Sequence, residues 1–128
     1  MAKDNIGSLK SRAVDFLEMV IAGRIDEAYE KFTDPNGKHH NPYFPEGFTS
    51  LRKAMKENHI QFPDKKFSVK NVIVDGNMVA VHSHLTMKAG EPGMIVVHIF
   101  RFGGDRIVEF WDCGQVIESN SPNRDGVF

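Results

Sequence analysis

The stretch 94–115, MIVVHIFRFGGDRIVEFWDCGQ, decides the fold of this chain. Apolar residues dominate both of its halves, and the segment 103–105 (GGD) between them has the composition of a tight turn. We therefore predict two antiparallel strands joined as a hairpin. Each strand carries one ionisable residue among apolar neighbours, His98 on the first and Asp112 on the second.

The register of this hairpin determines whether His98 and Asp112 share a face, because side chains alternate between the two faces of a strand. With a three-residue loop at 103–105, His98 faces Phe110 and Val96 faces Asp112. The His98 and Asp112 side chains are then diagonal neighbours, roughly 5–8 Å apart. They can form an acid–base pair in an apolar pocket. A two-residue loop places them on opposite faces.

Length and composition indicate a single domain. The chain has 128 residues, of which 41% are hydrophobic and 26% charged, enough to bury about two-thirds of the unfolded surface. We expect one domain over residues 1–128, with a polar surface tail from about residue 117. The formal net charge of −1 provides no electrostatic basis for binding nucleic acid or an anionic membrane surface.

The same data predict a cytoplasmic protein. The apolar runs are too short to cross a bilayer, and the first ten residues contain no hydrophobic signal-peptide core. Cys113 is the only cysteine, so no internal disulfide can form. The chain contains no Walker loop, dinucleotide-binding glycine pattern or nucleophile elbow, which argues against nucleotide chemistry and covalent acyl transfer.

Three helices are predicted before the strands. Apolar residues recur every three or four positions in 8–21 and 25–32, with Ser8 as the N-cap of the first helix and Gly23 ending it. A third helix is expected from residue 49 or 50 to about 59. Between the second and third helices, 33–47 (TDPNGKHHNPYFPEG) is a loop by composition, and its length suggests a function.

Four antiparallel strands are predicted to follow. Segments 67–74 and 77–87 flank the hairpin signal at Asp75-Gly76, and a turn at 88–93 leads into the hairpin described above. This order indicates an α+β fold in which three N-terminal helices pack on a curved antiparallel sheet. Because both faces of the last two strands are apolar, we expect a second copy of the chain to cover the face opposite the helices, forming a homodimer.

Asp112 and His98 have two interpretations. In one, Asp112 is a carboxylate at a strand end, bonded to backbone or paired with Arg101 or Arg106, and His98 is a satisfied core residue. In the other, burial disfavours the charged carboxylate and suits Asp112 to general acid–base catalysis, while His98 orients it or binds a substrate oxygen.

The remaining histidines suggest a polar pocket mouth or a metal site. His40 lies beside Asn41 and Tyr43 in the long loop, whereas His39 is expected to be a polar surface residue. His82 and His84 share one face of a strand, a spacing that can bind a metal if His40 or His98 joins them. No third ligand follows at a diagnostic spacing, so we predict no metal and no cofactor.

With its predicted elements, the ending VHIFRFGGDRIVEFWD resembles the SnoaL-like polyketide cyclases. These belong to the nuclear-transport-factor-2-like superfamily, which includes ketosteroid isomerase. The resemblance covers nearly the whole chain and implies a cone-shaped α+β barrel with an apolar pocket. In the cyclases, an aspartate on the last strand is the acid–base of an intramolecular aldol closure, and it matches Asp112. A histidine in the same VH..R setting matches His98, and an Asn-Pro after the second helix matches Asn41-Pro42.

This resemblance implies an aldol-condensation cyclase or an isomerase, with Asp112 and His98 as catalytic residues and neither a metal nor a Schiff-base lysine. The loop HHNPYFPEG and the strand residues 82–84 (HSH) have no counterpart in the cyclases, which favours a small or medium-sized apolar carbonyl ligand. The expected ligand-binding residues are Asn41, His40, Tyr43, Val96, Phe100, Phe110 and His82. The alternative is a non-catalytic small-molecule-binding or dimeric interaction module of the same fold.

Overall fold

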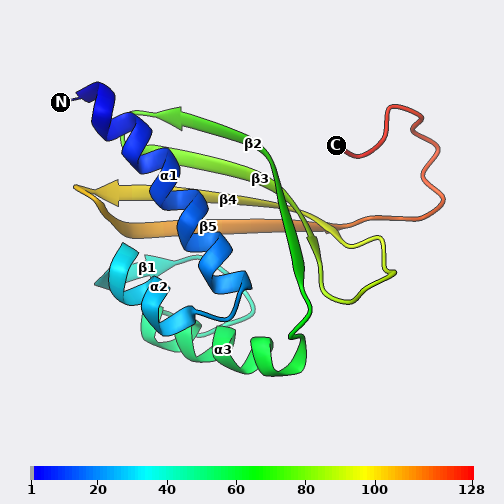
Figure 1. Cartoon of the computed structure of the whole chain (residues 1–128), viewed down its shortest axis with the longest axis horizontal. Helices are drawn as coiled ribbons and strands as arrows, with labels where there is room; N and C mark the ends of the chain where they lie inside the picture. The colour runs from blue at the N-terminus through cyan, green and yellow to red at the C-terminus, as the bar shows by residue number, and fades with distance from the viewer. Residues whose placement is uncertain (1) are drawn as a thin grey trace.

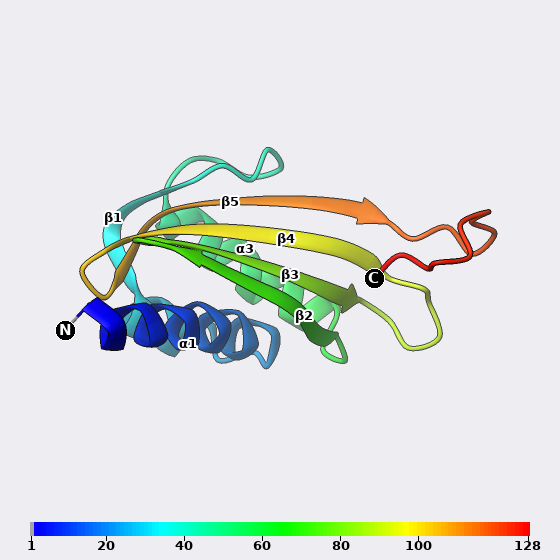
Figure 2. The same ribbon diagram turned by 90° about the horizontal axis from the view of Figure 1, so that it is seen from above.

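One mixed five-stranded sheet organises the chain, and the helices pack against one of its faces (Figures 1 and 2). The computed structural model describes residues 2–128, and the side chains of residues 9–128. The helices are α1 (Ala2–Ile21), α2 (Ile25–Phe32) and α3 (Phe48–Gln61). The strands are β1 (Thr33–His39), β2 (Lys66–Asp75), β3 (Met78–Thr86), β4 (Met94–Gly103) and β5 (Arg106–Val116). No helix in the described part of the chain is long and apolar enough to cross a membrane.

The strand order is β1-β5-β4-β3-β2, with β1 parallel to β5 and every other pair antiparallel. The edges β1 and β2 are not paired, so the sheet is curved but unclosed. This arrangement confirms the predicted α+β class. The side facing the helices is called the inner face, and the other side the outer face. Inner-face residues include Val79, Val81, Ser83, Val96, His98, Phe100, Phe110 and Asp112. Outer-face residues include Ala80, His82, Val97, Ile99, Glu109 and Trp111.

Strand β1 corrects the sequence prediction. Residues 33–47 were expected to be a loop, but the first seven form a strand that pairs with β5. Pro35 and Gly37 disfavour a strand locally, yet β1 lies at a sheet edge, and its register is irregular between Thr33 and Lys38. Proline is tolerated there because an edge strand need not donate every ladder hydrogen bond. The partner that makes this segment a strand lies far away in the sequence, so its composition could not reveal it.

Helix α1 also differs from its prediction, because it begins at Ala2 and Ser8 lies within it instead of capping it. Further along α1, the ring of Phe16 forms the centre of the core. Its edge-to-face partners are Tyr29, Phe32, Phe100 and Phe110, with ring centroids 5.2–6.4 Å away. These rings connect α1 and α2 to the inner face of β4 and β5.

The turn between β4 and β5 is tighter than predicted. Gly103 pairs with Arg106, so only Gly104 and Asp105 form the loop. The φ angle of Gly104 is +61°, as in a type II′ turn with glycine at its first central position. This two-residue loop, if continued as a regular ladder, would place the two ionisable residues of the hairpin on opposite faces.

A β-bulge in β5 restores the shared face. The register shifts between the pairs Phe102–Ile107 and Arg101–Glu109, which leaves Val108 as the extra residue. Without it, His98 would pair with Trp111. With it, His98 pairs directly with Asp112.

The predicted pairing of His98 with Phe110 is therefore wrong, because it assumed one longer loop and no bulge. The prediction that His98 and Asp112 share a face is confirmed. As direct partners they are closer than the diagonal arrangement would have made them.

Replacing Phe100 by Ala should test the aromatic core. The ring is wholly buried, so we expect the free energy of unfolding to fall by about 3–5 kcal/mol in a urea titration. Ile73→Ala is the control, because Ile73 lies on the outer side of β2 and is 68% exposed. Its effect should stay within about 0.5 kcal/mol. Equal losses in the two variants would contradict this packing.

Candidate functional site

The candidate site is the cross-strand pair His98–Asp112 on the inner face. Directly opposed residues of an antiparallel pair have Cβ atoms about 4.5–5.5 Å apart, and both residues are partly exposed. The apolar residues Val96, Phe100 and Phe110 are buried on the same face. The structure therefore brings together five of the predicted site residues, three apolar side chains on the same face as an imidazole and a carboxylate.

Asn41 joins this pair from the loop after β1. Its side-chain Nδ2 donates a hydrogen bond of 3.0 Å to Oδ2 of Asp112. Its Oδ1 accepts one from the backbone N–H of Tyr43 at 3.0 Å, which fixes the orientation of the amide. The predicted contribution of Asn41 to the site thus has a definite contact, with the carboxylate as acceptor.

His39 holds the loop that carries Asn41. Its Nδ1 accepts a hydrogen bond from the Asn41 backbone N–H at 3.1 Å, and its Nε2 lies 2.7 Å from the Pro45 carbonyl oxygen. Because Nδ1 is the acceptor, the ring proton resides on Nε2, which donates to Pro45. His39 is only 7% exposed, so the prediction of a polar surface residue is wrong. The strand alternation that points His39 inward appears only once β1 is recognised.

His40 points the other way and fastens the loop to the outer face. Its ring stacks on Trp111 with centroids 5.1 Å apart, and its Nε2 lies 2.6 Å from Oε2 of Glu109. Glu109 also pairs with Arg101 at 2.7 Å. The Arg101 guanidinium, and to a lesser degree His40, hold the pKa of the Glu109 carboxyl below its ordinary range.

Three other predicted residues lie away from Asp112. The Tyr43 side chain is 86% exposed. His82 is on the outer face, where its ring and that of His84 contact Phe128. Because these two histidines and His40 are on the opposite face from His98, the structure does not bring the four together as a metal site.

The His98 ring has an apolar environment. It lies parallel to the Phe100 ring, with an interplanar angle of 6° and centroids 6.0 Å apart, and it also contacts Phe110. Burial lowers the pKa of the imidazole to about 4, and the negative charge of Asp112 opposes this only in part. His98 is therefore neutral at pH 7 and carries one ring proton.

Tyr29 is a buried residue whose electrostatic link to Asp112 the sequence did not reveal. It lies on the apolar stripe of α2 and is 4% exposed, so its spacing matches an ordinary core position. Burial raises the pKa of its phenol, and the charge of Asp112 raises it further. The Tyr29 hydroxyl thus stays protonated within the electrostatic range of Asp112, as a potential hydrogen-bond donor.

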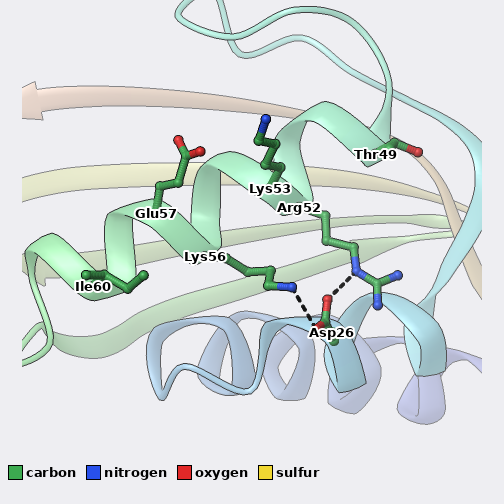
Figure 3. Close-up of a pocket in the computed structure, with 7 residues that line it drawn as sticks. All are labelled: Asp26, Thr49, Arg52, Lys53, Lys56, Glu57 and Ile60. Atoms are coloured by element: carbon green, nitrogen blue, oxygen red, sulfur yellow. Dashed lines mark hydrogen bonds and ion pairs between the residues drawn. The ribbon is translucent and has the colours of Figure 1, made fainter.

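A surface groove between α2 and α3 has a different character (Figure 3). Its lining residues are Asp26, Thr49, Arg52, Lys53, Lys56, Glu57 and Ile60. Asp26 pairs with Arg52 at 2.6 Å and with Lys56 at 2.9 Å, and Arg52 also reaches Glu30. These charges neutralise one another near the surface, where each pair contributes little. The groove lacks the buried polar groups that mark the inner face.

In the described residues, three helices packed on one face of a curved, unclosed sheet form the α+β cone of the nuclear-transport-factor-2-like proteins. Within that class, the profile of the SnoaL-like domain matches residues 13–110. The chain belongs to the SnoaL-like domain family, as the sequence resemblance predicted. No curated protein sequence matches the chain.

Solved structures agree with this assignment. A protein from Acidithiobacillus ferrooxidans, provisionally named a polyketide cyclase, has a TM-score of 0.67 at 24% identity, covering 84% of this chain and 87% of that one. A protein from Kribbella flavida, provisionally named a ketosteroid isomerase, has a TM-score of 0.72 at 17% identity, with coverages of 94% and 87%. A nuclear-transport-factor-2-like protein of unknown function from Burkholderia xenovorans has a TM-score of 0.73 at 17% identity, with coverages of 92% and 91%. At these identities the likeness shows the fold.

The depressed pKa of His98 predicts a pH-dependent stability. The folded imidazole has a pKa of about 4, below its ordinary value of 6.5. At a pH between these two values, the imidazole is therefore protonated in the unfolded chain and neutral in the folded chain. The free energy of unfolding should fall as pH decreases through this window and level off below it. At about 1.4 kcal/mol per pH unit, and with the residue partly exposed, we expect a loss of about 1–3 kcal/mol.

Chemical denaturation of wild type and His98→Gln between pH 4 and 7 measures this contribution. The decline should flatten in His98→Gln and persist in the control His40→Gln, whose ring lies on the outer face. An identical decline in wild type and His98→Gln would show that His98 is not responsible.

Proposed function

We propose that this protein binds a small or medium-sized apolar carbonyl compound at the inner face and transfers a proton at the carbon next to the carbonyl. Aldol cyclisation and double-bond isomerisation both begin in this way. One observation carries the proposal: the Asp112 carboxylate lies opposite a neutral His98 and accepts a hydrogen bond from Asn41. The neighbouring phenylalanines provide the apolar surroundings that such a substrate needs.

In this mechanism Asp112 is the general base. It removes the proton next to the carbonyl, the C–H electron pair forms the carbon–carbon double bond of an enolate, and the carbonyl π pair moves to the oxygen. His98, as a neutral ring with one N–H, donates a hydrogen bond to that oxygen. In an aldol closure the enolate carbon then attacks a second carbonyl, and the protonated Asp112 returns its proton to the new alkoxide.

The surrounding groups support these roles. The hydrogen bond from Asn41 occupies one oxygen of the carboxylate and holds its orientation, while the other oxygen can take the proton. Tyr29 retains its hydroxyl proton and adds a second potential donor for the enolate. The structural neighbours provisionally named a cyclase and an isomerase have the same fold, which is compatible with either reaction.

Deuterium exchange tests the assignment of Asp112. With 2-decalone in D₂O, followed by proton NMR, wild type should accelerate exchange beside the carbonyl above the buffer rate. Asp112→Asn should lose the acceleration by about 10²-fold or more, because general base catalysis contributes at least this factor. Asp105→Asn is the matched control, because Asp105 lies exposed in the hairpin loop, and it should behave as wild type.

The alternative function is a binding module without catalysis. It is favoured by the fact that Asn41 already engages Asp112 in a structural contact. If 2-decalone raises the melting temperature of wild type and Asp112→Asn equally, and neither protein exchanges deuterium faster than buffer, then the module replaces the enzyme as the better description.

We also propose that the outer face of β4 and β5 forms a homodimer interface. Ile95, Val97, Ile99 and Trp111 lie side by side on this face. The described helices all pack against the inner face, so none of them covers these residues. A second copy would bury them against the same apolar surface, as a twofold interface requires.

A charge placed in this surface should separate the subunits. We expect Ile99→Asp to convert a dimer into a monomer in sedimentation velocity, because a carboxylate would be buried without a partner. The control is Ile73→Asp, at an exposed position of β2 near the sheet edge, which should remain dimeric. A monomeric wild type at all concentrations would remove the dimer proposal.

A further inference from the structure

Two buried polar atoms on the inner face have no hydrogen-bond partner among the described residues. They are Oγ of Ser83 and Nδ1 of His98. Ser83 has no exposed surface, so bulk water cannot serve its hydroxyl. Folded proteins rarely leave such groups unpaired, because each has given up its hydrogen bonds to water without replacement.

The strand register makes these two residues neighbours. Val81 of β3 pairs with His98 of β4, and Ser83 pairs with Val96. Ser83 and His98 are therefore diagonal neighbours on one face, with Cα atoms roughly 7–8 Å apart and Cβ atoms somewhat closer. The Ser83 hydroxyl is carried on Cβ and turns about χ1, so its distance from Nδ1 of His98 depends on the Ser83 rotamer.

The surroundings leave each atom few other partners. The His98 ring is flanked by Phe100 and Phe110, which offer no hydrogen bond in its plane. Asp112, directly across the ladder, is engaged by Asn41 through one of its oxygens. A neutral imidazole with an unprotonated Nδ1 needs a donor, and a serine hydroxyl is both donor and acceptor.

We propose that the Ser83 hydroxyl donates a hydrogen bond to Nδ1 of His98 and thereby fixes the ring in its Nε2–H tautomer. Ser83 is then a positioning residue. The single ring proton resides on Nε2, the nitrogen that is not among the buried unpartnered atoms. The hydrogen bond at one nitrogen of an imidazole determines what the other nitrogen can do.

The consequence for chemistry rests on the proposed function. With Nε2 protonated, His98 presents a donor to a ligand carbonyl beside the Asp112 carboxylate. In the opposite tautomer Nε2 would present a lone pair, which repels a carbonyl oxygen and cannot stabilise an enolate. Ser83 therefore determines whether His98 can assist Asp112, although Ser83 itself touches no reacting atom.

The test is ¹⁵N NMR of histidine-labelled protein at pH 7, with the His98 signals assigned by their loss in His98→Gln. Wild type should show a protonated Nε2 and an unprotonated, hydrogen-bonded Nδ1. In Ser83→Ala the Nδ1 resonance should move downfield toward that of a free acceptor, and tautomers should mix. Ser83→Thr retains the hydroxyl and should restore the wild-type signals. Ser68→Ala, at an exposed position of β2, should change nothing.

Thermal unfolding provides a second, independent readout. A bonded Ser83 hydroxyl predicts a lower melting temperature for Ser83→Ala than for wild type, whereas an unbonded one predicts an equal or higher value. The inference is overturned by a protonated Nδ1 in wild type, by unchanged His98 signals in Ser83→Ala, or by a melting temperature that does not fall.

These measurements need no ligand, so their failure is distinct from failure of the proposed function. If deuterium exchange is absent while the ¹⁵N signals respond to Ser83, the tautomer assignment stands and the catalytic proposal falls. If exchange occurs, Ser83→Ala should slow it and Ser83→Thr should restore it. Both substitutions act through His98 alone, because Ser83 touches no reacting atom.

Discussion

The site depends on one local feature, the extra residue that Val108 adds to β5. The tight two-residue turn of the hairpin would otherwise place Asp112 on the outer face, beyond the reach of His98. A bulge and a tight turn compensate for each other, so the hydrophobic alternation of both strands continues on the correct faces. Phe110 reaches the aromatic core for the same reason that Asp112 reaches the site. Core and site are therefore set by the same register.

The core and the loop then hold the pair in place. Phe16 connects two helices to the sheet through edge-to-face contacts, and two of the same rings, Phe100 and Phe110, flank His98. The loop after β1 is attached on both sides of the sheet, by His39 inside and His40 outside. Asn41 directly follows these two anchors, which accounts for its defined contact with Asp112. The apolar environment that keeps His98 neutral thus depends on packing between residues that are distant in the sequence.

Much of this could be anticipated from local patterns. The helices, the β2–β3 hairpin and the family follow from periodicity, turn residues and the ending of the chain, and the profile match and the structure confirm them. His98 and Asp112 were recognisable as ionisable residues in apolar strands. Strand β1 was missed because Pro35 and Gly37 argue against a strand in isolation. The inward orientation of His39 was missed because it follows from that strand. Tyr29 was missed because its spacing resembles that of an ordinary core residue.

By itself, the sequence determined the class of fold, the order of most elements and the two residues around which a site could form, because each of these depends on patterns within a few residues. The tertiary structure alone decided which histidines meet Asp112 and which turn away. His98 lies opposite Asp112, whereas His40 and His82 lie on the other face. The single extra residue of the β5 bulge decides which face Asp112 occupies, and only the pairing of β5 with β4 shows where that residue lies.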